Sequence, residues 1–165
     1  MDDNALILIV VIAILICMSA YFSDTETAFS SLNKFKLKNL VANVSKKAEN
    51  ALKLSNNSDR ILSTILIGNN IVNIASASIA TIIFTKYYGD ADVTISTIVM
   101  TIVVLIFGEI SPKSLSKESP EKFAMFSTPI LRVLLVMFTP LNFLFGLWKK
   151  TISKVIKIEK ILIEE

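Results

Sequence analysis

The residues of this chain that could do chemistry are oxygen-bearing side chains in apolar surroundings, and they fall into three clusters. The first lies in FSDTETAFS, residues 22–30. Ser23, Thr27 and Ser30 follow an i, i+4, i+7 pattern, so in a helix they share one face, with Glu26 beside it. The pattern predicts a polar stripe at the end of a long apolar helix.

The second cluster is GNNIVN, residues 68–73, which places three carboxamides within five positions. Asn69 and Asn73 project from the same helix face, Ser76 extends their stripe, and Asn70 lies beside it. An amide buried in hydrocarbon without a partner costs several kcal/mol, so this segment needs partners or a ligand.

The third cluster is Gly108-Glu109, followed by Pro112. Proline lacks a backbone N–H and disfavours helical geometry at the residue before it, so we expect a distorted helix end with a backbone carbonyl left free. A carboxylate inside an apolar helix is by default a hypothesis of a functional site.

Together the clusters offer hydroxyl, amide, backbone-carbonyl and carboxylate oxygens. The chain has no histidine, and its one cysteine, Cys17, is interpreted as a packing residue in the first apolar run. This donor set suits Mg²⁺, Ca²⁺ or Na⁺. Structural interpretations stay open as well: Ser and Thr can bond their own helix, and an Asn can join two helices. Three amides near a carboxylate favour an ion site, since joining helices needs only one or two polar groups.

Three apolar runs must position these clusters: residues 5–22, 61–85 and 93–110. Each is close to or longer than the roughly 20 residues that a helix needs to span a bilayer. We predict an all-α membrane protein with spans at about 5–30, 61–86 and 93–111. No Lys or Arg precedes the first run, which favours a retained span over a secretory signal peptide.

The basic residues predict the topology. Residues 33–60 carry seven Lys or Arg and two acidic residues, which places this loop in the cytoplasm by the positive-inside rule. The N-terminus and the loop at 86–92 are then outside. The net charge of +3 could suggest nucleic-acid binding, but the distribution of the basic residues is explained by the membrane topology instead.

Residues 123–148 leave two alternatives open. Hydropathy alone makes them a fourth span, but Pro129, Arg132 and Pro140 interrupt the run, and a basic tail follows. The charge rule favours a cytoplasmic helical belt at about 120–148, broken at its prolines. Residues 1–148 would form one transmembrane domain, and residues 149–165 a juxtamembrane connector with a cytoplasmic C-terminus.

The motifs FSDTETAFSSL, GNNIVNI and FGEISPK, in that order and separation, resemble the transmembrane domain of the CorC/CNNM family of magnesium transport proteins. The likeness extends to SPEKFA and the proline-interrupted segment after it. The resemblance implies a cell-membrane homodimer, with three spans and a cytoplasmic belt in each subunit and a Mg²⁺ pocket open to the inside. It also implies outward transport with Na⁺ as the candidate coupling ion, and a cytosolic CBS-type module in the full-length protein.

Carried over by motif, the resemblance implies a set of metal-binding residues: Ser23, Thr27, Asn69, Asn73, Gly108 and Glu109. Supporting roles fall to Glu26, Ser30, Asn70, Ser76 and Pro112. The leading hypothesis is a Mg²⁺ transporter; the alternative is a membrane scaffold or Mg²⁺ sensor with a structural ion. An enzyme is not expected. A hydrolase would need a nucleophile with a base, and the chain has no histidine to act as that base. An intramembrane aspartyl protease would need two Asp residues within its spans, and the predicted spans supply no such pair.

Overall fold

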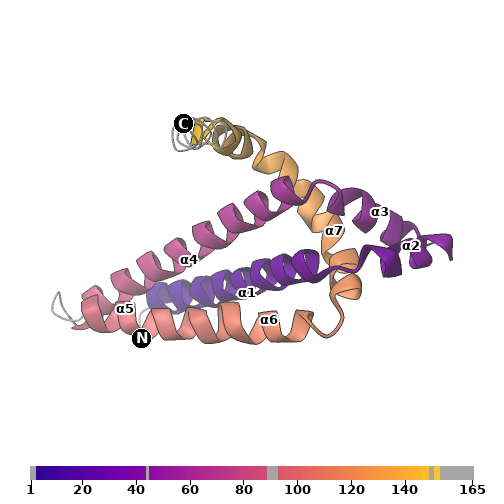
Figure 1. Ribbon diagram of the computed structural model, residues 1–165. Helices are drawn as coiled ribbons and strands as arrows, with labels where there is room; N and C mark the ends of the chain where they lie inside the picture. The colour runs from indigo at the N-terminus through magenta and orange to yellow at the C-terminus, as the bar shows by residue number, and fades with distance from the viewer. Residues whose placement is uncertain (1–2, 44, 89–92, 149–150, 153–165) are drawn as a thin grey trace, which may run out of the picture.

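The computed structural model describes residues 3–43, 45–88, 93–148 and 151–152, which are helical and include no strand, so the all-α prediction is confirmed (Figure 1). Two long helices come first, with two short ones between them: α1 (Asp3–Ser31), α2 (Lys34–Ala42), α3 (Lys46–Ser55) and α4 (Ser58–Tyr88). A second long rod follows, made of α5 (Val93–Val103), the π-helix η2 (Val104–Ile110) and α6 (Ser111–Ser116). The helix α7 (Pro120–Met137) then crosses the rods at the α2–α3 end.

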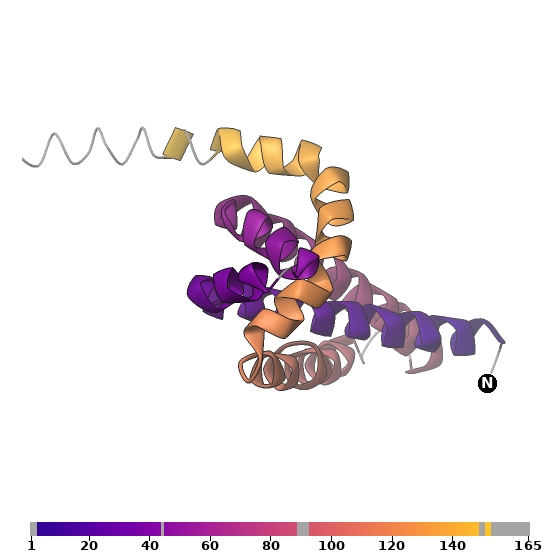
Figure 2. The ribbon, with the colours of Figure 1, turned by 90° about the vertical axis from the view of Figure 1, so that its right-hand side faces the viewer.

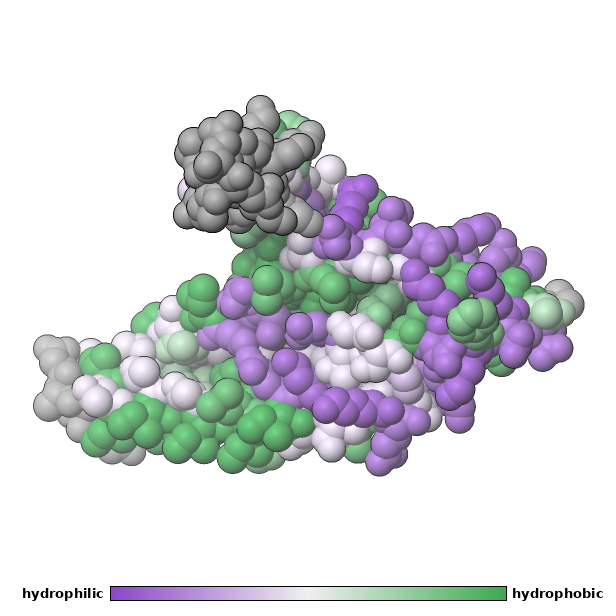
Figure 3. All heavy atoms as spheres, in the orientation of Figure 1, coloured by the Kyte–Doolittle hydropathy of each residue, from purple (hydrophilic) through white to green (hydrophobic). Residues whose placement is uncertain are grey.

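In the part of the chain that the structure describes, three single helical stretches are long and apolar enough to cross a membrane: Ala5–Ser31, Ser58–Tyr87 and Val93–Ser116. Their outer faces expose large aliphatic side chains, such as Ile14, Ile74 and Ile98. In Figure 3 hydrophobic residues gather along the rod that begins with α5, whereas hydrophilic residues gather over α2 and α3 and continue as a strip along the middle of the face. The three predicted spans are therefore confirmed as candidate membrane helices, while the orientation of the termini stays a prediction.

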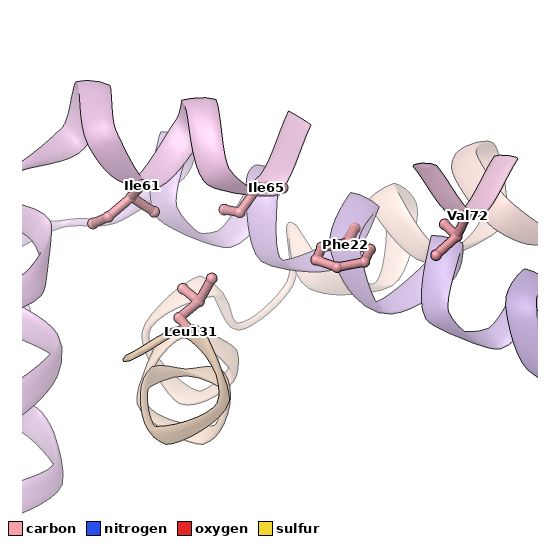
Figure 4. Packing of buried hydrophobic residues seen from close by; sticks show 5 residues of the cluster. All are labelled: Phe22, Ile61, Ile65, Val72 and Leu131. Atoms are coloured by element: carbon pink, nitrogen blue, oxygen red, sulfur yellow. The ribbon is translucent and has the colours of Figure 1, made fainter. Parts of the chain in front are cut away.

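The core lies where α1, α4 and α7 meet. Phe22 of α1 packs with Ile61, Ile65 and Val72 of α4 and with Leu131 of α7 (Figure 4). Gly68 of α4 faces the Phe22 ring so closely that a Cβ at this position would overlap it. A residue without a side chain is thus what lets α4 approach α1 one residue before Asn69.

The helix α7 differs in one respect from the predicted belt. It continues through Pro129, and the break falls at Phe138, after which the helix Thr139–Trp148 turns away by 71° (Figure 2). A proline inside a helix costs one backbone hydrogen bond and is tolerated where packing holds the helix in place. Here Ser127, Thr128 and Leu131 around Pro129 are all buried. Whether this bent pair lies along the membrane or crosses it stays a prediction, and most of the predicted connector lies outside the described residues.

Candidate functional site

The three membrane helices meet at Ser19 of α1. Its side chain is fully buried, and its Oγ donates a hydrogen bond to Asn69 Oδ1 of α4 at 3.0 Å. From the other side, Gly108 of η2 approaches so closely that a Cβ there would lie 2.8 Å from Ser19 Oγ. The glycines at 68 and 108 therefore bring both neighbouring helices against α1 at the level of the predicted amide cluster.

Asn73 joins α4 to the carboxylate of η2. Its Nδ2 lies 3.5 Å from Asn69 Oδ1 and 3.5 Å from Glu109 Oε1. Both distances are at the weak limit of hydrogen bonding. The Oδ1 atom of Asn73 is buried and has no hydrogen-bond partner. The structure thus brings together Asn69, Asn73, Gly108 and Glu109, four of the six residues predicted to bind a metal.

The predicted hydroxyl stripe lies on α1, shifted by one turn. Ser19, Ser23 and Thr27 are buried at i, i+4 and i+8, whereas Ser30 is exposed. Ser23 Oγ has no hydrogen-bond partner. Sequence reasoning missed Ser19, although continuing the four-residue spacing back by one turn from Ser23 would have found it.

The segment that carries Gly108 and Glu109 is a π-helix. The Ser111 N–H bonds to the Ile106 carbonyl, five residues back, and Pro112 has no N–H to offer the Gly108 carbonyl. The predicted distortion before Pro112 is therefore present, as a widened turn. Such turns are frequent at functional sites because they re-aim side chains and expose backbone oxygens.

The predicted supporting residues make contacts of their own, and their part in ion binding stays a prediction. Glu26 pairs with Lys113 of α6 at 3.5 Å, and both side chains are partly exposed. Ser76 Oγ donates to the Val72 carbonyl of its own helix at 2.7 Å, which is the structural role open to any helical serine. Asn70 is exposed. Pro112 is buried next to the π-helix, where it acts through the backbone.

The charge of the cluster is low. Within the described ranges there is no group of three or more His, Cys, Asp or Glu side chains that could hold a metal ion. The groups available to coordinate a cation here would be the Glu109 carboxylate and neutral oxygens. Another carboxylate that sequence reasoning missed is Asp24, whose Oδ1 is buried without a partner beside Ser23 in the chain.

These features define a multi-pass helical membrane domain whose three spans enclose a cluster of oxygen atoms. The chain belongs to the cyclin M family, because the Cyclin M transmembrane N-terminal domain matches residues 10–163. This finding confirms the resemblance seen in the three motifs.

Relatives carry the same domain within longer proteins. The chain is 41% identical over 152 residues to a UPF0053 protein of Haemophilus influenzae, covering 92% of this chain and 36% of that protein. It is 37% identical over 142 residues to the UPF0053 inner membrane protein YfjD of Escherichia coli, covering 86% and 33%. A more distant relative, 26% identical over 163 residues, is the polyamine export protein of Salmonella typhimurium, with 91% and 36% covered. The chain thus spans about a third of the length of these relatives.

Proposed function

We propose that this domain carries Mg²⁺ across the membrane and binds it between α1, α4 and η2. The ligands would be the amides of Asn69 and Asn73 and the Glu109 carboxylate. The Gly108 carbonyl and the hydroxyls of Ser19 and Ser23 would complete the oxygen set, with Thr27 one turn further along α1. The observation that carries this proposal is the buried, unpartnered Oδ1 of Asn73 beside that carboxylate.

The Asn73 amide suggests how the cluster exists with and without an ion. Its Nδ2 lies between two acceptor oxygens, on Asn69 and on Glu109. In that position the Asn73 amide N–H groups lie between Asn69 Oδ1 and Glu109 Oε1 and reduce the repulsion between these two oxygens. Rotation of the amide by half a turn would place Oδ1 in that position instead. Three oxygens pointing at one spot repel one another unless a cation lies between them, so binding would favour the rotated amide.

The low charge fits transport better than permanent retention. Mg²⁺ demands oxygen ligands and usually keeps several waters while using one or two carboxylates. Glu109 would offset half of the ion's charge, and neutral oxygens would replace part of its hydration shell. Binding of this kind is weak enough to permit release, and distorted helices near the membrane interior are a usual way in which transporters hold ions.

Two other functions compete with this one. The name of the Salmonella relative raises polyamine export, but a polyamine carries several ammonium groups along an extended chain. The compact cluster here presents one carboxylate among amides, which suits one small ion. The other alternative is a Mg²⁺ sensor or scaffold with a structural ion. We also expect a homodimer, outward transport coupled to Na⁺ and a cytosolic CBS-type module, as the family likeness implies.

The deciding experiment is flux in liposomes. The full-length protein would be reconstituted around a Mg²⁺ indicator, with and without a Na⁺ gradient, and compared with Asn73→Ala and Ser76→Ala. We expect flux with the wild type and with Ser76→Ala, and none with Asn73→Ala. Spermidine transport without Mg²⁺ flux would favour polyamine export. Mg²⁺ binding without flux would favour the sensor or scaffold.

A further inference from the structure

A second polar feature lies away from the ion cluster, where α7 passes beside α3 and crosses α1 (Figures 1 and 2). A cavity of about 420 Å³ opens between α3 and α7. Its lining holds two cationic side chains and an amide, Lys47, Arg132 and Asn50, and no carboxylate among the described residues. Positive charge without an acid in the same wall attracts an anion.

The cations of this cavity are accessible and one of them is held in place. Arg132 Nη2 donates to Asn50 Oδ1 at 2.7 Å, which links α7 to α3. A guanidinium has five N–H donors, so this bond leaves others for a ligand. Lys47 contributes an ammonium from α3, and both cationic side chains are exposed. An arginine fork beside a lysine is a usual way to bind a phosphate, because the phosphate oxygens accept from both.

A second cavity, of about 520 Å³, lies between α7 and α1 and is lined by apolar side chains together with Tyr21. Ile130 lines both cavities, so the two adjoin at this residue. On α1 the lining runs from Phe22 back to Val10, which is about 18 Å of helix at 1.5 Å per residue. The second cavity is therefore a long apolar groove that follows the candidate span Ala5–Ser31.

The two cavities together have the layout of a phospholipid, with a charged end and a long apolar end. Tyr21 holds the joint between α1 and α7, because its hydroxyl donates to the Ser127 carbonyl at 3.2 Å. Residues 33–60, which include Lys47, are predicted to face the cytoplasm. Anionic lipids are concentrated in the cytoplasmic leaflet, and basic pockets beside spanning helices on that side bind their headgroups.

We propose that the two cavities hold one anionic phospholipid. Its phosphate is bound by Arg132 and Lys47 between α3 and α7, and one acyl chain passes Ile130 and follows the groove along α1. A zwitterionic lipid such as phosphatidylcholine brings a quaternary ammonium toward the same two cations, which offsets the attraction of its phosphate. The net charge of the lipid is therefore what the site selects.

The first test is a lipid titration of the full-length protein in detergent, with bound lipid counted by native mass spectrometry. Phosphatidylglycerol and phosphatidylcholine with the same acyl chains are compared. We expect phosphatidylglycerol to fill its first position at an about tenfold lower concentration, as for one charge-assisted hydrogen bond. Equal concentrations for the two lipids, or no retained lipid because a second copy of the chain covers the groove, would overturn the proposal.

A soluble headgroup distinguishes a lipid from a free phosphate compound. Glycerol 3-phosphate carries the phosphate without acyl chains, so it should displace phosphatidylglycerol only at a far higher concentration than the lipid itself requires. Displacement at a similar concentration would mean that the cavity takes a free phosphate compound, and the lipid assignment would fall.

Variants of the basic cavity test the selection by charge. Lys47→Gln and Arg132→Gln should each reduce the preference for phosphatidylglycerol, and the double variant should abolish it. The matched control is Arg60→Gln, since Arg60 is also an exposed arginine but donates to Thr139 away from this cavity, at 3.1 Å. It should keep the preference. Helicity by circular dichroism verifies that each variant is folded, and a folded double variant that still prefers phosphatidylglycerol would contradict the site.

A variant of the groove tests the place of the acyl chain. Ala13→Phe fills the groove away from the cations, so it should weaken the binding of both lipids by the same factor and leave their ratio unchanged. Ile74→Phe is its control, because Ile74 is 67% exposed on α4 and lines neither cavity. It should bind both lipids as the wild type does. If Ala13→Phe also bound them as the wild type does, the acyl chain would lie elsewhere and the proposal would fail.

Discussion

Two regions of the molecule differ in how far their polar side chains have hydrogen-bond partners: the α2–α3 end, and the bundle of α1, α4 and η2. At the α2–α3 end, Asn33 accepts hydrogen bonds from the backbone N–H groups of Phe35 and Lys36. Ser45 caps α3 by accepting from the Ala48 N–H, and Glu49 pairs with Lys53 at 2.6 Å. These groups are satisfied, although several of them are exposed and water could have served instead.

Inside the bundle some polar groups are satisfied, such as Ser19 and Asn69, but others are not. Asn73 Oδ1 and Ser23 Oγ are buried without partners, in the part of the molecule where no water is expected to replace them. An unsatisfied polar group is most costly there. The difference teaches that the polar residues of α2 and α3 build the fold, whereas Asn73 Oδ1 and Ser23 Oγ have no partner among the described residues. A cation would supply that partner.

The largest expected effect is the loss of stabilisation by Mg²⁺ in Asn73→Ala and Glu109→Gln. A bound ligand stabilises by mass action, by about 2.7 kcal/mol at a concentration of ~100 Kd. Glu109→Gln keeps the shape but removes the charge that offsets a divalent ion. Melting curves with and without Mg²⁺ should show the gain in the wild type and in neither variant.

The control for this prediction is Ser76→Ala, because Ser76 bonds only its own helix. It should keep the whole Mg²⁺ gain. If Asn73→Ala also kept the gain and merely melted lower, by the roughly 0.6–1.7 kcal/mol of an interhelical polar contact, the bundle amides would serve packing and the contrast between the two regions would fail.

The next effect concerns the close approach that forms the cluster. Gly68→Ala inserts a Cβ into the Phe22 ring, and overpacking of this kind typically costs about 1–3 kcal/mol. It should lower the melting temperature and weaken Mg²⁺ binding, measured by calorimetry, because α4 moves away from Ser19. Gly146→Ala is the matched control, since nothing lies within 4 Å of its Cβ position. A harmless Gly68→Ala would mean that the helices can separate without affecting the cluster.

Much of the cluster was predictable because its signals are local. Long apolar runs give the three spans, and the four-residue spacing of Asn69 and Asn73 places both amides on one face. Pro112 predicts a distorted helix end, because proline has no backbone N–H and restricts the residue before it. This inference needs no information about packing. These inferences required only periodicity and the chemistry of proline.

What could not be predicted depends on packing between helices. A serine in an apolar helix usually bonds its own backbone, so the spacing alone gives Ser19 a place on the stripe but no role; its role arises because Gly108 and Asn69 both approach it. Glu26 shows the reverse. Its position beside the hydroxyl stripe suggested a supporting ligand, which stays a prediction, and packing adds a partner that the pattern did not indicate, because Lys113 of α6 pairs with it at 3.5 Å. Likewise, packing around Pro129 keeps α7 continuous where local rules predict a break.

A smaller effect is expected at the α2 cap. Asn33→Ala removes the acceptor for two N–H groups and should destabilise the protein by about 1 kcal/mol, as is typical of an N-cap. The Mg²⁺ gain should stay unchanged, because the cap serves the fold alone. Chemical denaturation with and without Mg²⁺ measures both quantities. A reduced Mg²⁺ gain would show that the α2–α3 end and the bundle are coupled.

The smallest effect is expected for Glu49→Gln on α3. Glu49 accepts a hydrogen bond from Lys53 and is attracted by its charge, and both lower the pKa of the Glu49 carboxyl. A lowered pKa means that the pair stabilises the folded state above the pKa of the unfolded chain, and that this contribution is lost as the pH falls through the folded value. The wild type should therefore melt slightly higher than Glu49→Gln at neutral pH, and the two should converge in acid. Because the pair is exposed, high salt should remove most of the difference. Melting temperatures at both pH values and two salt concentrations test this, and a difference that grew in acid would contradict the assigned sign. Glu109→Gln is the informative counterpart: the same substitution inside the bundle should barely change the metal-free protein and should remove its response to Mg²⁺.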